Sequence, residues 1–365
     1  MERTINGRDQ MPERKRVTLK DIANATGYSV PLVSVALSGK CDGTTKLSDT
    51  TREKVIKAAK EMNYKPNIFG RSLRANKSFL VGVLFFDVND WLMGDFLYGA
   101  QHVLSEAGYA PIFLSHATKE EQRHNLEICM DRRVDGIILN LWINEDTGEA
   151  DSEFVFKTLG EKFPALEVYG YHMPEAISTT VDFQESFYAM CCDLIAGGAK
   201  RIAMVNHEKY DLGGDEGTLF INAWQCAQGY KRAMEEHNLS IEMALHPLSR
   251  DKSPTAAAVA MAENAGKTFR GLVEKDGVPD AIVCMNDEQA FGVLRTCVDM
   301  GVKVPDDMSI RGVGNTSVGK LAGISTCDVS AMKVGSTAAQ SILKLINNEK
   351  VESSKIFAPL ILRNT

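Results

Sequence analysis

The chain has 365 residues, of which 44% are hydrophobic and 24% are charged, and its formal net charge is −7 at pH 7. This length allows a sizeable core and more than one domain, because a single core rarely grows beyond about 250–300 residues. The polar start MERTINGRDQMPERKR lacks the apolar region of a signal peptide, and no apolar run approaches the roughly 18 residues of a membrane span. We therefore expect a cytoplasmic protein.

The eight cysteines are scattered along the chain without a CxxC pair or a Cys/His array. This spacing argues against a zinc site and against a disulfide framework, so the cysteines are expected to be small buried residues. Cys191 and Cys192 are adjacent, but on a helix their side chains would point about 100° apart, which disfavours a shared metal or redox site. No metal or cofactor is expected.

The charge is distributed unevenly between the two ends of the chain. Residues 1–77 contain 16 Lys and Arg against 8 Asp and Glu, a net charge of +8, which leaves −15 on the remaining 288 residues. A basic head on an acidic body is typical of a polyanion-binding module attached to a second function. The alternative is an ordinary solvated surface on a small domain.

The first residues predict an arm followed by three short helices. Residues 1–16 lack hydrophobic periodicity and end in three basic residues, which indicates a flexible basic arm. The next segment, residues 17–66, begins with a helix that Thr18 caps and Gly27 ends. Ser29 should cap the second helix and Ser48 the third, which is expected to stop before the proline at residue 66.

Residues 67–78 form a short basic segment with too few apolar residues for a core of its own. From residue 79 the sequence alternates between strand and helix patterns. The expected strands are FLVGVLFFD, APIFLSH, VDGIILNLW, FPALEVYGY, RIAMVNH, DAIVCMND and MSIRGVG. Such alternation predicts an α/β body with two doubly wound parallel sheets and a cleft at the carboxyl ends of their strands.

The pattern VTLKDIANATGYSVPLVSVALSG, followed by LSDTTREKVIKAAKEMNYKPN and then GRSLRANKS, resembles the LacI/GalR family of bacterial transcriptional regulators. The resemblance covers nearly the whole chain. It implies a small all-α helix-turn-helix domain, a hinge, and a two-lobed body similar to periplasmic binding proteins. The implied boundaries are 79–172 and 329–355 for lobe 1, and 173–328 and 356–365 for lobe 2.

The resemblance also implies partners. The chain should be a homodimer that binds operator DNA through its head and a small effector, a carbohydrate or related metabolite, between the lobes. Whether the effector releases DNA or promotes its binding stays open. A solute-binding protein is one alternative, which the missing signal peptide and the basic head oppose. A sugar-metabolising α/β enzyme with a helical appendage is another.

The expected DNA-binding residues of the head fall into two groups. Hydroxyls of Thr18, Ser34 and Thr51 can bond phosphate oxygens, although capping or a solvated surface is the alternative for each. In the second helix, the resemblance places Val30, Pro31 and Val35 where bases are contacted, with Val33, Ala36 and Leu37 as the buried face. We expect the remaining head contacts at Ser29, Leu32 and Lys40.

The second helix offers mainly methyl groups to DNA, because the family's usual arginine is replaced by Val35. Methyl groups suit the thymine C5 methyl and cannot make bidentate bonds to guanine or adenine. Direct readout should therefore be weak, with more discrimination from the hinge, Lys40 and DNA deformability.

The segment NIFGRSLRA resembles the family's hinge helix, in which paired leucines from two subunits wedge into the minor groove. Leu73 matches that leucine, and we expect further contacts from Asn67, Arg71 and Arg74. Gly70 departs from the usual alanine and should lower helix propensity by up to ~1 kcal/mol, so hinge folding would depend more on DNA. A plain linker is the alternative.

The expected effector site combines matches to the family with departures from it. NDEQAFG resembles the family's segment with Asn286 and Asp287 at a strand end, where helix capping is the alternative role. DVNDW supplies Asn89, Asp90 and Trp91, with a core role as the alternative for the tryptophan.

The departures change the expected chemistry of the effector pocket. Cys226 replaces an arginine that commonly binds the ligand in the family. Gly314 and Asn315 replace the family's usual acidic turn. Tyr169 and Gly170 replace an Asp-Arg pair. With Asn222 and Trp224 added, the expected pocket is less charged and more aromatic, which predicts an uncommon effector.

The sequence contains no constellation of residues for catalysis. It lacks a GxSxG elbow, an HExxH motif, a P-loop and a GxGxxG before a helix. Asp287 and Glu288 are adjacent carboxylates, but at the start of a helix they should point apart. The chain is therefore not expected to be an enzyme.

Overall fold

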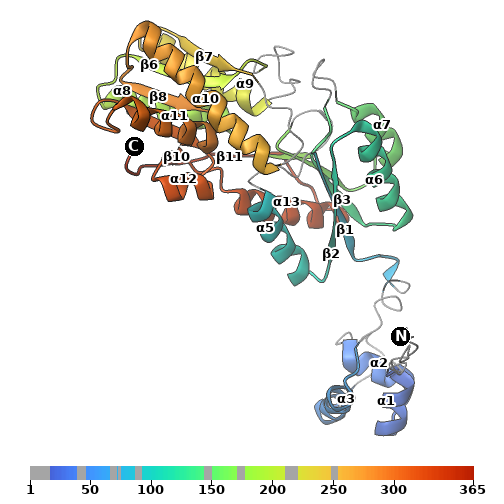
Figure 1. Cartoon of the computed structure of the whole chain (residues 1–365). Coiled ribbons are helices and arrows are strands. Elements are labelled where there is room, and N and C mark those ends of the chain that lie inside the picture. Colours follow the sequence, from blue (N-terminus) through green and yellow to red (C-terminus); the bar gives the residue numbers. More distant parts are fainter. Residues whose placement is uncertain are drawn as a thin grey trace, which may run out of the picture. The chain divides into compact units, whose positions relative to one another are not determined.

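The structure is a computed structural model that describes residues 17–38, 47–65, 72, 75–86, 93–143, 150–170, 177–209, 221–247 and 254–365. The chain divides into two compact units, Met1–Asn76 and Lys77–Thr365, which we call the head and the body. Figure 1 shows the helical head and the two lobes of the body, each of which contains one sheet.

The head contains the three predicted helices, α1 (Leu19–Thr26), α2 (Val30–Ser38) and α3 (Asp49–Glu61). They pack around a small core that includes Ile22, Val33 and Val55, all fully buried. Gly27 ends α1 in the left-handed region, with φ 73°, which a residue without Cβ adopts without strain. The predicted ends of α1, with Thr18 as its N-cap and Gly27 as its C-cap, are therefore confirmed.

The first lobe contains a six-stranded parallel sheet in the order β11-β5-β4-β3-β1-β2. Its strands are β1 (Leu80–Phe86), β2 (Ala110–His116), β3 (Gly136–Leu139), β4 (Ala165–Val168), β5 (Ile177–Val181) and β11 (Ser354–Ile356). Its helices are α5 (Met93–Glu106), α6 (Lys119–Asp131), α7 (Ser152–Leu159) and α13 (Ala331–Ile346).

The second lobe repeats this arrangement with the order β12-β10-β9-β8-β6-β7, in which only β12 is antiparallel to its neighbour. The strands are β6 (Ile202–His207), β7 (Glu242–His246), β8 (Ala281–Cys284), β9 (Ser309–Val313), β10 (Ser325–Cys327) and β12 (Leu360–Ile361). The helices are α8 (Phe183–Ala196), α9 (Ile221–Glu236), α10 (Pro254–Asp276), α11 (Asp287–Met300) and α12 (Ser317–Ala322).

The expected start of the second lobe at residue 173 is wrong, because β5 pairs with β4 and β11 of the first sheet. The strand ISTTV is rich in hydroxyl side chains, and Ser178, Thr179 and Thr180 are nevertheless buried. Its sequence lacks the apolar run of a strand covered on both faces, so no local signal revealed it. The first lobe also takes β11 up to Ile356, one residue beyond the expected limit.

The expected hinge, residues 67–78, ends earlier than predicted. Lys77 Nζ donates to Asn347 Oδ1 at 3.1 Å, so this side chain is anchored in the body. The carboxylate of Asp135 accepts the backbone N–H groups of Ser78 and Phe79 at 2.9 and 2.8 Å. These bonds join the last two expected hinge residues to the first lobe.

Two pairs of helices pack so closely that glycine is required where they cross. A Cβ on Gly99 of α5 would lie 2.1 Å from the carbonyl oxygen of Met332 in α13. A Cβ on Gly292 of α11 would lie 1.9 Å from the carbonyl oxygen of Ala262 in α10. Both separations are below van der Waals contact, so any side chain there would push the helices apart.

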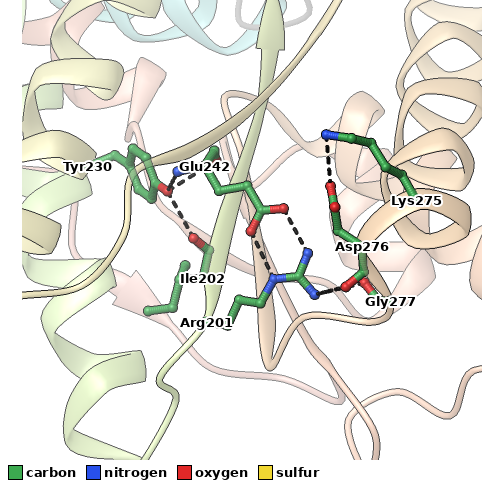
Figure 2. A network of polar contacts seen from close by, with 7 residues as sticks. All are labelled: Arg201, Ile202, Tyr230, Glu242, Lys275, Asp276 and Gly277. Atoms are coloured by element: carbon green, nitrogen blue, oxygen red, sulfur yellow. Dashed lines mark hydrogen bonds and ion pairs between the residues drawn. The ribbon is translucent and has the colours of Figure 1, made fainter.

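A polar network fixes the amino ends of β6 and β7 (Figure 2). The Arg201 guanidinium donates two bonds to Glu242, at 2.9 and 2.7 Å, and further bonds to the carbonyls of Asp276 and Gly277. The Tyr230 hydroxyl donates to Ile202 O at 2.8 Å and accepts the Glu242 N–H. The network lies at the opposite end of these strands from the expected cleft, so we interpret it as structural.

The described cysteines are all free thiols, and six of the seven are buried, while Cys192 is half-buried. This confirms the prediction of small buried residues for those six. Within the described chain, no cluster of His, Cys, Asp or Glu could hold a metal ion. None of the helices described is both long and apolar enough to cross a membrane.

Candidate DNA-binding head and effector site

The α2 helix presents a bare apolar first turn to solvent. Val30 is 39% exposed and Pro31 is exposed, while Leu32, Ser34 and Val35 are half-buried. The Val33 N–H donates to the carbonyl of Ser29 at 3.0 Å, which places Ser29 at the start of the helix. The predicted inward face is confirmed, because Val33 and Ala36 are buried and Leu37 packs against the head core.

Two of the three hydroxyls expected to bond phosphates, those of Thr18 and Thr51, take part in hydrogen bonds at helix caps. Thr18 Oγ1 donates to Asp21 Oδ2 at 2.7 Å and accepts the Asp21 N–H at 3.3 Å. Thr51 Oγ1 shares a 2.8 Å hydrogen bond with Ser48 Oγ, which caps α3. Capping is therefore the observed role of Thr18, whereas Thr51 bonds the capping side chain of Ser48. The phosphate contacts of both threonines stay predictions.

Because Thr18 closes a reciprocal capping box, we expect Thr18→Ala to lower the free energy of unfolding of the head by about 1 kcal/mol. Thr18→Ser keeps the acceptor oxygen and should retain most of that stability. Chemical denaturation followed by helical circular dichroism on both variants measures the difference. Equal stability of Thr18→Ala and the unchanged chain would contradict the capping role.

Part of both expected sites lies outside the described residues. This applies in the head and hinge to Lys40, Asn67, Arg71, Leu73 and Arg74, and in the body to Asn89, Asp90 and Trp91. These residues stay predictions from the sequence.

Asn286 and Asp287 lie where β8 passes into α11, and both side chains serve the second lobe itself. Asn286 caps α11, accepting the Gln289 N–H at 2.8 Å, which is the alternative role foreseen for it. Asp287 is 0% exposed, and its two oxygens accept the Thr326 hydroxyl at 2.6 Å and the Thr316 N–H at 2.7 Å. Burial raises the pKa of Asp287.

The direct effector contact expected of Asp287 is not supported by this geometry, since both of its oxygens are committed to the protein. Cβ positions on Gly312 and Gly319 would lie 2.4 and 2.3 Å from these oxygens, so the glycines make room for the carboxylate. Asp287 thereby ties α11 to the chain segments that follow β9 and form β10.

Three histidines end strands at the side where effectors bind in doubly wound sheets. They are His116 of β2, His207 of β6 and His246 of β7, and all three are buried. Burial lowers the pKa of His116 to about 4 and that of His207 to about 3, and it also lowers the pKa of His246. Sequence reasoning missed them, although each follows an apolar run as the strand's last residue.

His246 belongs to a defined hydrogen-bond chain with α11. Its Nδ1 lies 2.9 Å from the carbonyl of Pro247, and its Nε2 lies 2.9 Å from Gln289 Nε2. Gln289 Oε1 accepts the Met285 N–H at 3.1 Å, so the amide nitrogen must face the imidazole. The neutral tautomer with its proton on Nδ1 satisfies every one of these contacts.

The start of α9 places polar side chains beside the carboxyl end of β6. Asn206 Nδ2 donates to the Ala223 carbonyl at 3.2 Å and joins that strand to the helix. Asn222 and Trp224 are half-buried, and Gln225 is 7% exposed. Sequence reasoning identified the first two and missed Gln225, whose spacing of three from Asn222 puts both on one side of the helix.

A hollow of about 760 Å³ lies between the lobes. It is bounded by the first turn of α5, by residues 314–320 leading into α12, and by residues 328–336 around the start of α13. Its charged residues are Asp95, Lys320, Asp328 and Lys333, two of each sign. Of the predicted effector residues, Asn315 lines it.

Comparison with known proteins agrees with this geometry. Residues 18–67 match the model of "Bacterial regulatory proteins, lacI family", and residues 193–365 match "Periplasmic binding protein-like domain". Catabolite control protein A of Priestia megaterium is 27% identical over 350 residues, covering 94% of this chain and 96% of that protein. The chain therefore combines a lacI-family helix-turn-helix region with a periplasmic-binding-protein-like domain.

Further relatives and solved structures extend the comparison. Regulator RegA of Clostridium saccharobutylicum is 26% identical over 344 residues, covering 92% of this chain and 94% of that protein. The Lac repressor dimer bound to operator and the anti-inducer ONPF matches with a TM-score of 0.74 and 21% identity, over 96% of this chain and 99% of that one. The CelR–cellobiose complex matches with a TM-score of 0.62 and 18% identity, over 96% and 99%. These likenesses confirm the predicted fold class.

In this chain, three of the expected effector residues are engaged elsewhere. Cys226 is buried in the core of the second lobe, so it cannot stand in for a ligand-clamping arginine, and that expectation is wrong. The Asn315 side chain accepts a hydrogen bond from Arg363. Tyr169 is buried, with its ring centroid 6.4 Å from Phe85 and 5.9 Å from Phe96.

Tyr169 follows β4 with φ 56°, a left-handed conformation that is unusual for a bulky residue. Its packing on two phenylalanines makes it part of the first-lobe core, so direct effector contact by Tyr169 is not supported. Trp142, which follows β3 and is half-buried, is an aromatic residue at this edge that sequence reasoning missed.

Proposed function

We propose that this LacI-family chain regulates transcription by binding an operator through its head, with an affinity set by a small ligand bound between its lobes. The observation that carries the proposal is the three-helix head, which matches the family's DNA-binding model and sits within the basic residues 1–77. Clustered Lys and Arg favour DNA through counterion release. The exposed first turn of α2 supports contact with a major groove.

We propose that the active form is a homodimer on a pseudo-palindromic operator. One solved relative is a Lac repressor dimer bound to operator. In this chain β2 and β7 are edge strands, and each exposes a large apolar side chain, Phe113 and Leu245. Tyr98 of α5 is also exposed. Apolar groups on sheet edges favour association with a second copy.

Coupling between ligand and operator would follow from a change in lobe angle. The chain crosses between the lobes at the segments after β5 and after β10, and it returns between β11 and β12. Asp135 fixes the entry of the hinge to the first lobe. A ligand that favours one angle would therefore shift the spacing of two hinges in a dimer and change operator affinity.

Selection of operators from random duplexes, with and without candidate sugars, tests this function. We expect enrichment of a two-fold symmetric sequence, rich in thymine where α2 lies, and a change in enrichment when an effector is present. Failure to enrich any sequence would leave only an unspecific DNA binder.

For the hinge, we expect Leu73→Ala to weaken operator binding at least tenfold and to leave ligand binding unchanged. The reason is the loss of an apolar wedge that would stabilise bent DNA, a contribution of the order of 1–3 kcal/mol. Fluorescence anisotropy with the selected operator measures the first quantity and calorimetry the second. Unchanged operator affinity would show that the segment is a plain linker.

The enzyme alternative has little support. The relatives named above are regulators, and Asp287 is committed to structural bonds. Incubation of the chain with candidate sugars, followed by product analysis, tests it directly. Turnover would require this proposal to be revised.

A further inference from the structure

We infer that Asp135 is a positioning residue for operator binding, because its carboxylate fixes the direction in which the chain enters the first lobe. The inference rests on the proposed function, since it gives a residue of the body a role in binding DNA. Asp135 lies at the amino ends of β1 and β3, whereas the hollow between the lobes follows the carboxyl ends of the strands. Its role is therefore separate from contact with an effector.

The first observation is that one carboxylate holds two successive backbone amides. Asp135 directly precedes β3, and its Oδ1 and Oδ2 accept the N–H groups of Ser78 and Phe79, which directly precede β1. We call this pair of bonds the Asp135 clamp. Hydrogen bonds to a charged acceptor are stronger than those between neutral groups. Because each oxygen takes one amide, the peptide between the two amides cannot rotate without breaking a bond.

The second observation is the backbone of Phe79, which has φ 57°. A bulky residue in the left-handed region is strained, and it persists only where its surroundings hold it. The Phe79 carbonyl accepts the Ala110 N–H at 2.9 Å, and the ring centroid lies 5.5 Å from that of Tyr109. The chain thus turns into β1 in one defined conformation, with a strain that a plain linker would not need.

The third observation is a bond one residue further from the strand. Lys77 Nζ donates to Asn347 Oδ1 at 3.1 Å, and Asn347 directly follows α13. The same helix packs against the clamp, because a Cβ on Gly136 would lie 3.0 Å from side-chain carbons of Ile342 and Ile346. The entry of the chain is therefore held by two elements of the first lobe, β3 and α13.

The second lobe contains a corresponding clamp. Asp280 directly precedes β8, and its Oδ2 accepts the N–H groups of Lys200 and Arg201, which directly precede β6, at 2.8 and 2.9 Å. In each sheet the two strands joined in this way are neighbours. The sequence carries the repeat as VDGIIL and PDAIVC. Each clamp therefore supports the sheet to which it belongs.

The two clamps differ in the chain that precedes them. Before Lys200 lies α8, which packs against α9 of the same lobe, so the second lobe holds this entry from both sides. Before Lys77 the chain belongs to the head, which is a separate compact unit. The Asp135 clamp therefore lies where the DNA-binding unit joins the body, and the Asp280 clamp does not.

Freedom at the entry would weaken binding to an operator with two half-sites. When one head of a dimer is bound, the second meets its half-site at an effective concentration that the connecting segments set. A chain that swings at residues 77–79 would spread the second head over more positions and lose more conformational freedom on binding. Binding of one head to one half-site has no such dependence. The ratio of the two affinities therefore reports positioning, and a purely structural role would not change it.

The test compares Asp135→Ala with Asp280→Ala in the full chain, because each variant removes both bonds of one clamp. We expect Asp135→Ala to weaken binding to the full selected operator at least tenfold and to leave binding to a single half-site duplex within about twofold. Asp280→Ala should bind both duplexes normally. Fluorescence anisotropy at one fixed salt concentration measures the affinities, and urea unfolding should show a loss of stability in both variants.

Two further variants keep the test decisive if Asp135→Ala folds poorly. Asp135→Asn keeps one acceptor oxygen, so it should lose less operator affinity than Asp135→Ala. Asn347→Ala removes only the exposed acceptor of Lys77 and keeps the lysine charge, so it should also weaken binding to the full operator more than to the half-site. Hydrogen exchange followed by mass spectrometry should show faster exchange in peptides that contain residues 77–80 of Asp135→Ala.

Three results would overturn the inference. They are full operator affinity of Asp135→Ala, an equal loss on the full and half-site duplexes, and an equal loss in Asp280→Ala. Each of them leaves the proposed function standing, because an operator has then been selected and bound. Failure to select any operator would refute the function and this role of Asp135 with it.

Discussion

Gly292→Ala should destabilise the body by about 3 kcal/mol or more, although alanine is the better helix former by ~1 kcal/mol. The reason is the crossing of α10 and α11, where the new Cβ would lie 1.9 Å from the carbonyl oxygen of Ala262. Gly266 of α10 lies at the same crossing, where a Cβ on it would be 2.9 Å from the Gly292 carbonyl oxygen. Because backbone meets backbone, no side-chain rotation relieves the overlap. Urea unfolding of the full chain measures the loss.

Gly271→Ala is the matched control in the same helix pair. This glycine lies in α10, and nothing is within 4 Å of its Cβ position. Alanine there should raise the free energy of unfolding by up to ~1 kcal/mol, because only the helix propensity changes. If the two variants had similar stabilities, close packing of these helices would not be the reason for Gly292.

Acidification from pH 7 to pH 5 should lower the free energy of unfolding of the body by about 4 kcal/mol through His116 and His207. Their pKa values in the folded protein are about 4 and about 3, below the ordinary value of 6.5, because burial disfavours the charged imidazole. The unfolded chain therefore takes up protons below pH 6.5 while the folded chain does not. Stability is present above that pH and is lost as the pH falls toward the folded values.

The size of this effect follows from the ordinary pKa. The ordinary histidine pKa lies about 1.5 units above pH 5. Protonation of each histidine at pH 5 therefore stabilises the unfolded chain by about 2 kcal/mol. His116 ends β2 in the first lobe and His207 ends β6 in the second, so their contributions should add. His246 lies beside His207 and acts in the same direction.

Denaturation at a series of pH values, on the chain with His116→Gln and His207→Gln, measures the dependence. The double variant should lose most of the slope between pH 7 and pH 5, whatever its stability at pH 7. His102→Gln replaces an exposed histidine of α5 and should keep the slope of the unchanged chain. A double variant with an unaltered slope would mean that other groups cause the acid sensitivity.

Most of the head could be predicted from sequence because its signals are local. A capping threonine with Asp21 three residues later, and a glycine with positive φ at residue 27, act within one helix and its immediate neighbours. The strands of the body with apolar runs were predicted for a similar reason, since β1, β3 and β6 consist mainly of apolar residues that are buried. β5 had no such signal, because its buried residues are hydroxyl-bearing.

The same distinction between local and long-range interactions applies to the effector site. The sequence by itself indicated the resemblance to the LacI family, the order of strands and helices around the site, and the absence of an arginine at position 226. The tertiary structure decided which side chains remain available there. It commits Asp287 to Thr316 and Thr326, buries Tyr169 and Cys226, and leaves Asn222 Oδ1 and Gln225 Oε1 without a hydrogen-bond partner among the described residues. Those outcomes depend on contacts between residues far apart in the chain, which no local pattern encodes.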